Sequence, residues 1–174
     1  MFILALLLLA FSGSDLVGTQ APEWNNQQWL NSQPLKLSQL KGKVVLLRFF
    51  MESSCPMCRA SAPYLNDFYA KYKDDGLVVV GMYTPKPNPR KTEIEAVKLF
   101  VTDYGFEFPV ALDNDWATLK SFWLNRVPDA RFTSVSFLID RKGTIRYIHS
   151  GGTYSPEDAA ALKNRIEQLI NEKS

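Results

Sequence analysis

The two cysteines of this chain, Cys55 and Cys58, are the only ones in its 174 residues. They lie where an apolar run, residues 43–50, ends and a stretch with apolar residues at helical spacing begins. A strand, a tight loop and a helix that starts at the motif place the first sulfur at a helix N-terminus. Free backbone N–H groups and the helix dipole favour thiolate over thiol there. The second sulfur, three positions later, can form a disulfide with the first, so the pair predicts redox chemistry.

A Cys-x-x-Cys pair can also belong to a metal site or form a structural disulfide. The residues of this chain support each of these two alternatives only in part. With one histidine, His149, and no second cysteine pair, Cys and His alone cannot build a four-ligand zinc site. A purely structural disulfide would close a very short loop and so restrain the unfolded chain little. A metal site completed by carboxylates or by a partner, and a simple disulfide, both stay open as alternatives to the redox pair.

Predicted strands and helices alternate along the rest of the chain. The strands are short runs rich in β-branched or aromatic residues, and the helices have apolar residues at helical spacing. Strands are predicted over residues 35–40 (an edge strand), 43–50, 77–83, 108–112, 134–139 and 144–149. Helices are predicted after Cys55, over 92–104, over 116–124 and after Ser155. Ser155 caps the last of these, Pro156 takes its first helical position, and Asp158 completes a capping box. Three prolines make 84–91 a loop, which we interpret as solvated. The order predicts an α/β fold, with a central mixed sheet and helices on both faces.

Composition allows one domain with a substantial core and argues against a nucleic-acid partner. The chain has 46% apolar and 13% aromatic residues, as globular proteins have. Its formal charge is only +2, whereas a nucleic-acid-binding surface normally shows a clear excess of lysine and arginine. We expect a monomer that requires no organic cofactor.

The N-terminus opens with ten apolar residues in a row, residues 2–11, followed by small residues. Such a run has the length of a signal-peptide core and about half the length of a membrane span. It lacks the preceding Lys or Arg that a signal peptide normally has. We expect residues 1–17 to be a signal peptide or a truncated membrane anchor and residues 18–174 to be the folded domain. Export fits the cysteine pair, because disulfides persist in oxidising compartments.

Several stretches of the chain resemble the thioredoxin-like proteins of the TlpA/ResA type. The resemblance covers residues 18–170 and is carried by 42–50 (GKVVLLRFF), 55–65 (CPMCRASAPYL), 72–81 (YKDDGLVVVG) and 137–146 (FLIDRKGTIR). From residue 29 to 115 the chain is particularly similar to the soluble thioredoxin-like domain attached to DipZ-type membrane proteins. The resemblance implies a thioredoxin-like fold with the TlpA-type insertion, a helix plus a short strand, matched here by residues 92–112.

The same resemblance implies a thiol–disulfide oxidoreductase that is periplasmic or otherwise extracytoplasmic, and an N-terminal membrane anchor is compatible with this location. Cys55 would attack a protein disulfide as a thiolate, and Cys58 would resolve the mixed disulfide. Pro56 and Met57 form the dipeptide between the cysteines. The family favours the reducing direction, with protein thiols or disulfides as substrates and a membrane electron donor of the DsbD/CcdA kind.

The chain departs from the family at the cis-proline that normally faces the cysteine pair. Ser134, preceded by Thr133, stands at this position of the substrate loop. Because a cis bond without proline costs about 3–4 kcal/mol, we expect a trans Thr133–Ser134 bond. We also expect the Ser134 hydroxyl to face Cys55, where it would tune the pKa of that thiol or help to hold a metal ion.

The residues around the motif depart from the family pattern as well. Met51 and Ser54 stand where the family commonly has tryptophan. Phe49 stands at the position of the buried acid that assists the second cysteine in thioredoxins. Glu52 is the nearest replacement acid, and two roles are open for it: a proton relay for the cysteines or a solvated loop carboxylate.

Two further functions occur on this fold and are kept as alternatives. A peroxiredoxin-like peroxidase would have Thr three residues before its cysteine and Arg at the cis-proline position, where this chain has Glu52 and Ser134. A copper-handling protein of the Sco type would use Cys-x-x-x-Cys and a histidine just before the hairpin. Here the spacing is one residue shorter and His149 lies at the far end of the hairpin, so we interpret His149 as a strand residue.

Overall fold

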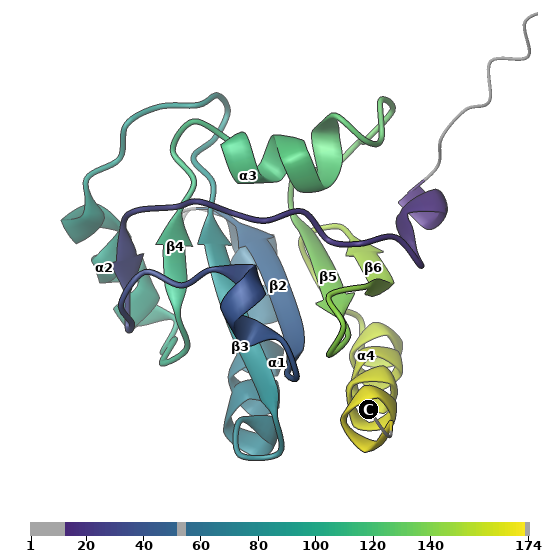
Figure 1. The fold of residues 1–174 in the computed structure, drawn as a ribbon. Helices are drawn as coiled ribbons and strands as arrows, with labels where there is room; N and C mark the ends of the chain where they lie inside the picture. The colour runs from purple at the N-terminus through teal and green to yellow at the C-terminus, as the bar shows by residue number, and fades with distance from the viewer. Residues whose placement is uncertain (1–12, 52–54, 173–174) are drawn as a thin grey trace, which may run out of the picture.

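A computed structural model describes residues 13–51 and 55–172, and a six-stranded mixed sheet forms its centre (Figure 1). The strand order is β1–β4–β3–β2–β5–β6. The strands are β1 (Trp29–Leu30), β2 (Val44–Phe50), β3 (Leu77–Tyr83), β4 (Val110–Leu112), β5 (Val135–Ile139) and β6 (Ile145–Ser150). β3 is parallel to both of its neighbours, and the other pairs are antiparallel. The predicted α/β class with a mixed sheet is confirmed.

Helices lie on both faces of this sheet (Figure 1). The α-helices are α1 (Pro56–Tyr72), α2 (Ile94–Asp103), α3 (Ala117–Leu119) and α4 (Pro156–Asn171). A π-helical turn, η3 (Lys120–Leu124), directly follows α3, and the 3₁₀ helices η1 (Gly13–Leu16) and η2 (Leu37–Leu40) belong to the N-terminal part of the chain. The helix α2 and the strand β4 correspond to the predicted TlpA-type insertion.

The strand β2 shows why the sheet is covered on both faces. All seven of its residues are buried, and successive side chains of a strand point to opposite faces. On one face its side chains pack with α1, α2 and α4 (Val44, Leu46 and Phe50). On the other face they pack with the N-terminal segment and η3 (Val45, Leu47 and Phe49). Arg48 is the one charged residue in this otherwise apolar strand.

Residues 35–40 are predicted as an edge strand, but no strand forms there, and Leu37–Leu40 form the 3₁₀ helix η2. The carboxylate of Glu23 accepts hydrogen bonds from the backbone N–H groups of Leu37 and Ser38, and this stabilises the first turn of the helix. In a 3₁₀ helix, residues three apart lie on the same side. The spacing of Leu37 and Leu40 therefore suits this helix, whereas in a strand the two side chains would point to opposite faces.

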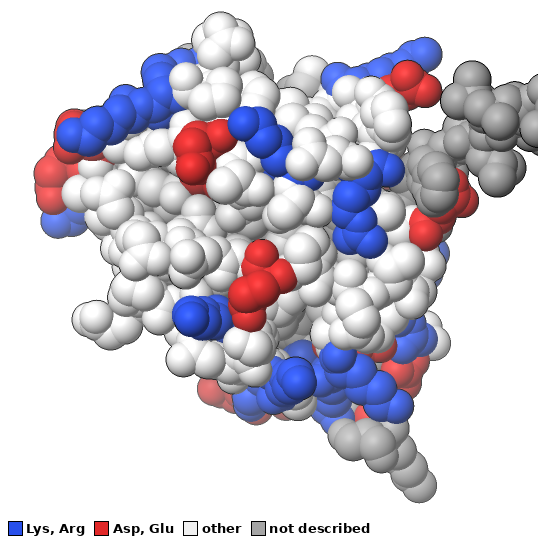
Figure 2. All heavy atoms as spheres, turned by 45° about the horizontal axis from the view of Figure 1, so that its top comes forward, with Lys and Arg blue, Asp and Glu red and all other residues white. Residues whose placement is uncertain are grey.

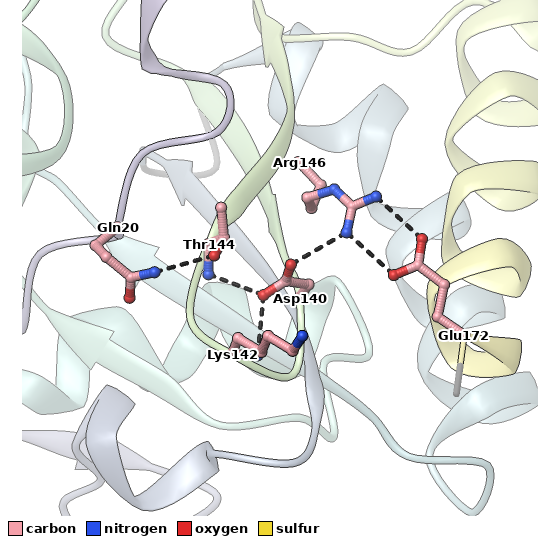
Figure 3. Close-up of polar contacts among 6 residues, drawn as sticks. All are labelled: Gln20, Asp140, Lys142, Thr144, Arg146 and Glu172. Carbon is pink, nitrogen blue, oxygen red and sulfur yellow. Dashed lines mark hydrogen bonds and ion pairs between the residues drawn. The ribbon is translucent and has the colours of Figure 1, made fainter. Parts of the chain in front are cut away.

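The turn between β5 and β6 is held by the side chain of Asp140 (Figure 3). One of its carboxylate oxygens accepts hydrogen bonds from the backbone N–H groups of Lys142 and Thr144, each at 2.9 Å. The other oxygen lies 3.1 Å from Arg146, which also contacts Glu172 at 3.0 Å, just beyond the end of α4. The predicted hairpin is confirmed, and this network ties it to the C-terminal helix.

The start of α4 also has the predicted form. Ser155 Oγ accepts a hydrogen bond from the Asp158 backbone N–H at 3.1 Å, and the Asp158 carboxylate accepts one from the Ser155 N–H at 3.0 Å. Of the predicted signal or anchor segment, residues 1–12 lie outside the described residues. Within residues 13–51 and 55–172, no helix is long and apolar enough to cross a membrane.

Candidate active site

The cysteine pair lies at the start of α1, shortly after the end of β2. Cys55 is the N-cap residue of α1, and Pro56 occupies the first helical position, where the missing N–H of proline leaves no hydrogen bond unmade. Cys55 Sγ accepts a hydrogen bond from the backbone N–H of Cys58 at 3.3 Å. The sulfur thus lies at the positive end of the helix, as predicted, where a thiolate is stabilised.

The two sulfurs differ in their environment. Cys55 is partly exposed, whereas Cys58 is only 2% exposed, and both are free thiols. Burial raises the pKa of the Cys58 thiol to about 11, and its hydrogen bond with Cys55 acts in the same direction. A hydrogen bond to the Met51 backbone and the charge of Arg48 lower this pKa without cancelling the effect of burial. Cys55 is therefore the sulfur that a protein substrate can reach, and Cys58 is hard to ionise.

Arg48, in the middle of β2, is completely buried. Its guanidinium donates hydrogen bonds to Ser136 Oγ at 3.1 Å and to the carbonyls of Gly151 and Gly152 at 2.9 and 2.7 Å. Its Cζ lies 5.2 Å from the centre of the Tyr154 ring. Within the described part of the chain it has no carboxylate partner. Its charge is thus available to the thiolate of Cys58.

The turn after β6, which Arg48 holds, packs directly on the motif. A Cβ added at Gly152 would lie 2.6 Å from the Cβ of Met57, closer than two carbon atoms can pack. Only glycine lets the backbone at this position contact the motif dipeptide so closely. Arg48 therefore links β2 and β5 to the segment that supports Met57.

Lys86, in the loop after β3, is a second cation that is partly buried. The backbone N–H of Thr84 donates to the Phe50 carbonyl at 2.8 Å, and this holds the start of the loop beside the end of β2. Lys86 Nζ is buried without a hydrogen-bond partner among the described residues, and it lies 4.8 Å from the centre of the Trp116 ring. Burial lowers the pKa of Lys86 to about 8, although the charges of the two cysteines act to raise it.

Tyr104, at the C-terminal end of α2, belongs to the same buried cluster as Cys58. Its hydroxyl is buried and has no hydrogen-bond partner in the described ranges. Burial raises the pKa of Tyr104 to about 12, and the charge of Cys58 acts in the same direction. The guanidinium of Arg59 lies 5.6 Å from the centre of its ring. The insertion that carries α2 thus contributes to the surroundings of the sulfurs.

The predicted substrate loop has the expected backbone. The Thr133–Ser134 bond is not among the cis peptide bonds, so it is trans, as the lack of proline predicts. The carbonyl of Ser134 accepts a hydrogen bond from the Gly151 N–H at 2.9 Å, which joins this loop to the turn that Arg48 holds. The approach of the Ser134 hydroxyl to Cys55 stays a prediction.

The remaining predicted site residues fall into two groups. Glu52 and Ser54 lie outside the described residues, so the proton relay proposed for Glu52 stays a prediction. Phe49 is buried against Phe122 and Phe137, so an aromatic cluster fills the position where thioredoxins have a buried acid. His149 lies in β6, as predicted, and its Nε2 lies 2.7 Å from the Thr153 carbonyl.

The end of the sheet where β2 and β3 finish, uppermost in Figure 1, is turned toward the viewer in Figure 2. Charged side chains of both signs are scattered over this face between larger uncharged areas. In residues 13–51 and 55–172, no group of three or more His, Cys, Asp or Glu side chains is placed to hold a metal ion.

Sequence reasoning did not identify Arg48, Lys86, Tyr104 or Gly152 as parts of the site. For Arg48 a signal was available, because a charged residue inside a fully buried strand must have specific partners. Lys86 stands in a proline-rich loop for which the sequence predicts solvation, and no local pattern shows that its amine is buried. Tyr104 and Gly152 carry no local signal either, because their contacts come from remote parts of the chain.

Comparison with known proteins gives matches over most of the chain. A family model described as redoxin matches residues 16–165. Protein DipZ of Mycobacterium tuberculosis is 35% identical over 148 residues, which are 83% of this chain and 19% of that protein. The thiol-disulfide oxidoreductase ResA of Bacillus anthracis is 33% identical over 129 residues, 74% of this chain and 66% of that protein. The chain therefore spans about a fifth of the length of DipZ.

Solved structures have the same fold. A candidate thiol:disulfide interchange protein DsbE from Chlorobium tepidum superposes with a TM-score of 0.69 at 30% identity, covering 89% of this chain and 98% of that one. A candidate protein disulfide isomerase from Bacteroides thetaiotaomicron gives a TM-score of 0.73 at 28% identity, covering 90% and 91%. These matches confirm the thioredoxin-like fold, and the names of the relatives support an oxidoreductase of the thiol–disulfide class.

Proposed function

The chain belongs to the redoxin family, and we propose that it is a thiol–disulfide oxidoreductase that works outside the cytoplasm in the reducing direction. The observation that carries the proposal is the position of the two sulfurs. Cys55 is partly exposed at the N-terminus of α1, and the buried Cys58 donates its backbone N–H to it at 3.3 Å. Relatives named as thiol–disulfide oxidoreductases support the same chemistry.

The reaction begins when the Cys55 thiolate attacks one sulfur of a protein disulfide. A bond forms between Cys55 Sγ and that sulfur, and the second substrate sulfur leaves as a thiolate that takes up a proton. Cys58 then loses its proton and attacks Cys55 Sγ, which breaks the mixed disulfide. The substrate leaves with two thiols, and the chain keeps a Cys55–Cys58 disulfide, so two electrons have passed to the substrate.

The rest of the site has supporting roles in this proposal. Met57 of the motif dipeptide is 53% exposed, so together with Pro56 it offers a surface to a docked substrate. The loop at Thr133 and Ser134 would receive the substrate backbone beside the sulfurs. A membrane electron donor of the DsbD/CcdA kind would return the chain to the dithiol state after each turnover.

Localisation and direction rest on the sequence rather than on the geometry of the site. The apolar run at residues 2–11 supports export, by a signal peptide or a membrane anchor within residues 1–17. The similarity to ResA and DipZ supports the reducing direction. The natural substrates are proposed to be proteins with disulfides exposed in an extracytoplasmic compartment.

A redox titration tests the chemistry and the direction. The metal-free protein is equilibrated in buffers with a series of ratios of reduced to oxidised glutathione. Free thiols are then alkylated, and the intact mass of the protein is measured by mass spectrometry. We expect both cysteines to change together in a two-electron transition, near the roughly −270 mV of thioredoxin for a reductant. A midpoint near the roughly −120 mV of strong oxidants would reverse the direction. Cys58→Ser is the matched control, since it cannot form the internal disulfide, and a wild-type pair that never closes would refute the proposal.

A further inference from the structure

Arg48 points from β2 to the side of the sheet on which Cys58 is buried. Successive residues of a strand point to opposite faces, so the side chains of Leu46, Arg48 and Phe50 share one face. Leu46 and Phe50 belong to the same buried cluster as Cys58. Phe49 packs in the cluster on the other face. The guanidinium of Arg48 is therefore buried on the side of the sheet that α1 covers, and Cys58 lies in the first turn of that helix.

The guanidinium holds two successive backbone carbonyls. Its Nη1 donates to the carbonyl of Gly151 at 2.9 Å, and its Nη2 donates to the carbonyl of Gly152 at 2.7 Å. Burying a charge is costly, and an apolar side chain at this position would avoid that cost. What arginine supplies, and an apolar residue does not, is a planar fork of N–H donors that can bind two acceptors at once. The contacts therefore indicate that Arg48 serves to fix the backbone of this turn.

The turn that Arg48 fixes lies between the substrate loop and the cysteine motif. On one side, the N–H of Gly151 donates to the carbonyl of Ser134 at 2.9 Å. On the other side, a Cβ added at Gly152 would lie 2.6 Å from the Cβ of Met57 and 3.0 Å from its Sδ. Two neighbouring glycines thus join the loop to the motif dipeptide, and Arg48 binds the carbonyls of both.

The other partners of Arg48 belong to the same two sides. Nη1 also donates to Ser136 Oγ at 3.1 Å, and Ser136 lies two residues after Ser134, in the strand that continues the substrate loop. Ser136 Oγ hydrogen-bonds to the hydroxyl of Tyr154, and the Tyr154 ring lies 5.2 Å from Arg48 Cζ. That ring also meets the ring of Tyr64 in α1 edge to face, with 6.1 Å between the ring centres. One guanidinium therefore connects the loop, the turn and the helix of the motif.

These contacts fix the substrate loop where no proline ring does so. A proline ring fixes the backbone φ angle of its residue, but this position of the loop is occupied by Ser134. Here the Ser134 carbonyl is bound by the N–H of Gly151, and the carbonyl of Gly151 is bound by Arg48. The position of the loop thus depends on a buried side chain in β2.

We propose that Arg48 is a positioning residue that sets the spacing between the motif dipeptide and the substrate loop, a role that rests on the proposed oxidoreductase function. Met57 is 53% exposed beside the cysteines. A peptide segment that carries a disulfide docks between Met57 and the loop at Ser134 while Cys55 attacks. Arg48 contacts neither the substrate nor the reacting sulfurs in this role. It keeps both docking surfaces in place before the substrate arrives, and preorganised surfaces lose less free energy on binding.

Two activated disulfides with the same leaving group separate docking from thiol reactivity. One is 5,5′-dithiobis(2-nitrobenzoate), and the other is a short peptide whose central cysteine is joined by a disulfide to 5-thio-2-nitrobenzoate. With either probe the Cys55 thiolate of the reduced protein attacks one sulfur, a new disulfide forms, and the coloured thiolate leaves with the electron pair of the broken bond. Only the peptide probe offers a backbone and side chains to Met57 and the substrate loop.

The variant is Arg48→Lys, which keeps a positive charge but has no planar fork to bind two carbonyls. Arg146→Lys is the matched control, because Arg146 lies in the same hairpin but contacts the carboxylates of Asp140 and Glu172 at the β5–β6 turn. Ser136→Ala is a milder second variant, which removes one acceptor of the guanidinium. Thermal unfolding reports whether each variant is folded.

We expect Arg48→Lys to raise the half-saturating concentration of the peptide probe about tenfold, because misplaced docking surfaces weaken binding. Its maximal rate with the peptide and its rate with the small disulfide should change less than about threefold, since Cys55 stays at the helix N-terminus. Ser136→Ala should show the same split with a smaller change, about threefold in half-saturating concentration. It carries the test if Arg48→Lys does not fold. Arg146→Lys should behave as the wild type.

Three results would overturn the positioning role. The first is a wild-type half-saturating concentration in every folded variant. The second is an equal change of rate with both probes, because Arg48 would then act on Cys55 itself or on the fold. The third is a wild type that shows no saturation with the peptide, since there would be no docking surfaces to position.

The glutathione titration distinguishes these results from failure of the proposed function. A Cys55–Cys58 pair that closes in the titration leaves the oxidoreductase proposal standing, even where the role of Arg48 is refuted. If the wild-type pair never closes, the oxidoreductase proposal fails and the role of Arg48 fails with it.

Discussion

At the β5–β6 turn, Arg146 lies within 3.1 Å of the carboxylates of Asp140 and Glu172 (Figure 3). In contrast, Arg48 in β2 and Lys86 in the loop after β3 have no carboxylate partner among the described residues. Arg146 is partly exposed, whereas the charged groups of Arg48 and Lys86 are buried. An exposed charge is stabilised by water even when its partner is removed, whereas a buried one depends on the groups around it.

The difference indicates what each region is for. The turn network is satisfied in the resting protein and serves to hold the hairpin against the C-terminal helix. Arg48 and Lys86 have polar or aromatic partners instead of an anion, and in the proposed reaction the anion that forms is a cysteine thiolate. A site prepared for a charge that appears only during the reaction needs little rearrangement when it forms.

The largest effect is expected from Arg48→Met. It would leave the Gly151 and Gly152 carbonyls without their donors in a buried site, and we expect a loss of about 3 kcal/mol in the free energy of unfolding. Urea denaturation at pH 7 measures this loss. If the variant were as stable as the wild type, the buried cation would not support the site, and the contrast with the turn would break down.

Gly152→Ala tests the contact between the turn after β6 and the motif. The new Cβ would lie 2.6 Å from the Met57 Cβ, so we expect a loss of about 1–3 kcal/mol from overpacking and slower reaction of Cys55 with a disulfide. Gly18→Ala is the control, because Gly18 has a φ of 89° and nothing within 4 Å of the new Cβ. A loss of stability in Gly18→Ala would report backbone strain alone, and the rate at which Cys55 reacts with a disulfide should stay unchanged. If Cys55 reacted at the wild-type rate in Gly152→Ala, the contact with Met57 would not matter.

Lys86→Met should increase stability at pH 7. The pKa of Lys86 is lowered in the folded state to about 8, so between pH 8 and about 10.5 the unfolded chain binds more protons and wild-type stability rises with pH. The penalty of the buried charge is fully present below pH 8. We expect a gain of about 1 kcal/mol there after allowing for solvent screening, disappearing above about pH 10.5. Urea denaturation at several pH values measures it, and a variant less stable at pH 7 would contradict it.

Arg146→Ala is expected to have the smallest effect. Its ion pairs are partly exposed, and such pairs contribute about 0.2–1 kcal/mol each and are screened by salt. Denaturation at low and high salt should show a small loss that shrinks with ionic strength. A loss as large as that of Arg48→Met would mean that pairing at the turn stabilises the fold as strongly as the buried cation does.

Much of the scaffold could be predicted because its signals are local. The apolar run before Cys55 predicts β2, the pattern after it predicts α1, and Ser155, Pro156 and Asp158 predict the start of α4, all of which the structure contains. The prediction was wrong at residues 35–40, where backbone N–H groups donate to the carboxylate of Glu23, more than ten residues away in the sequence, and favour a 3₁₀ turn over a strand. A local pattern cannot contain such a partner.

By itself, the sequence determined the strands β2 to β6, the main helices and the place of Cys55 and Cys58 at a helix N-terminus, because hydrophobic periodicity and capping act between near neighbours in the chain. Only the tertiary structure decided what surrounds the sulfurs. Arg48, Lys86, Tyr104 and Gly152 come from four separate parts of the chain, and only packing of those parts buries their groups. Whether the amine of a loop lysine is solvated or buried depends on segments that lie far away in the sequence, and those segments decide the surroundings of this site.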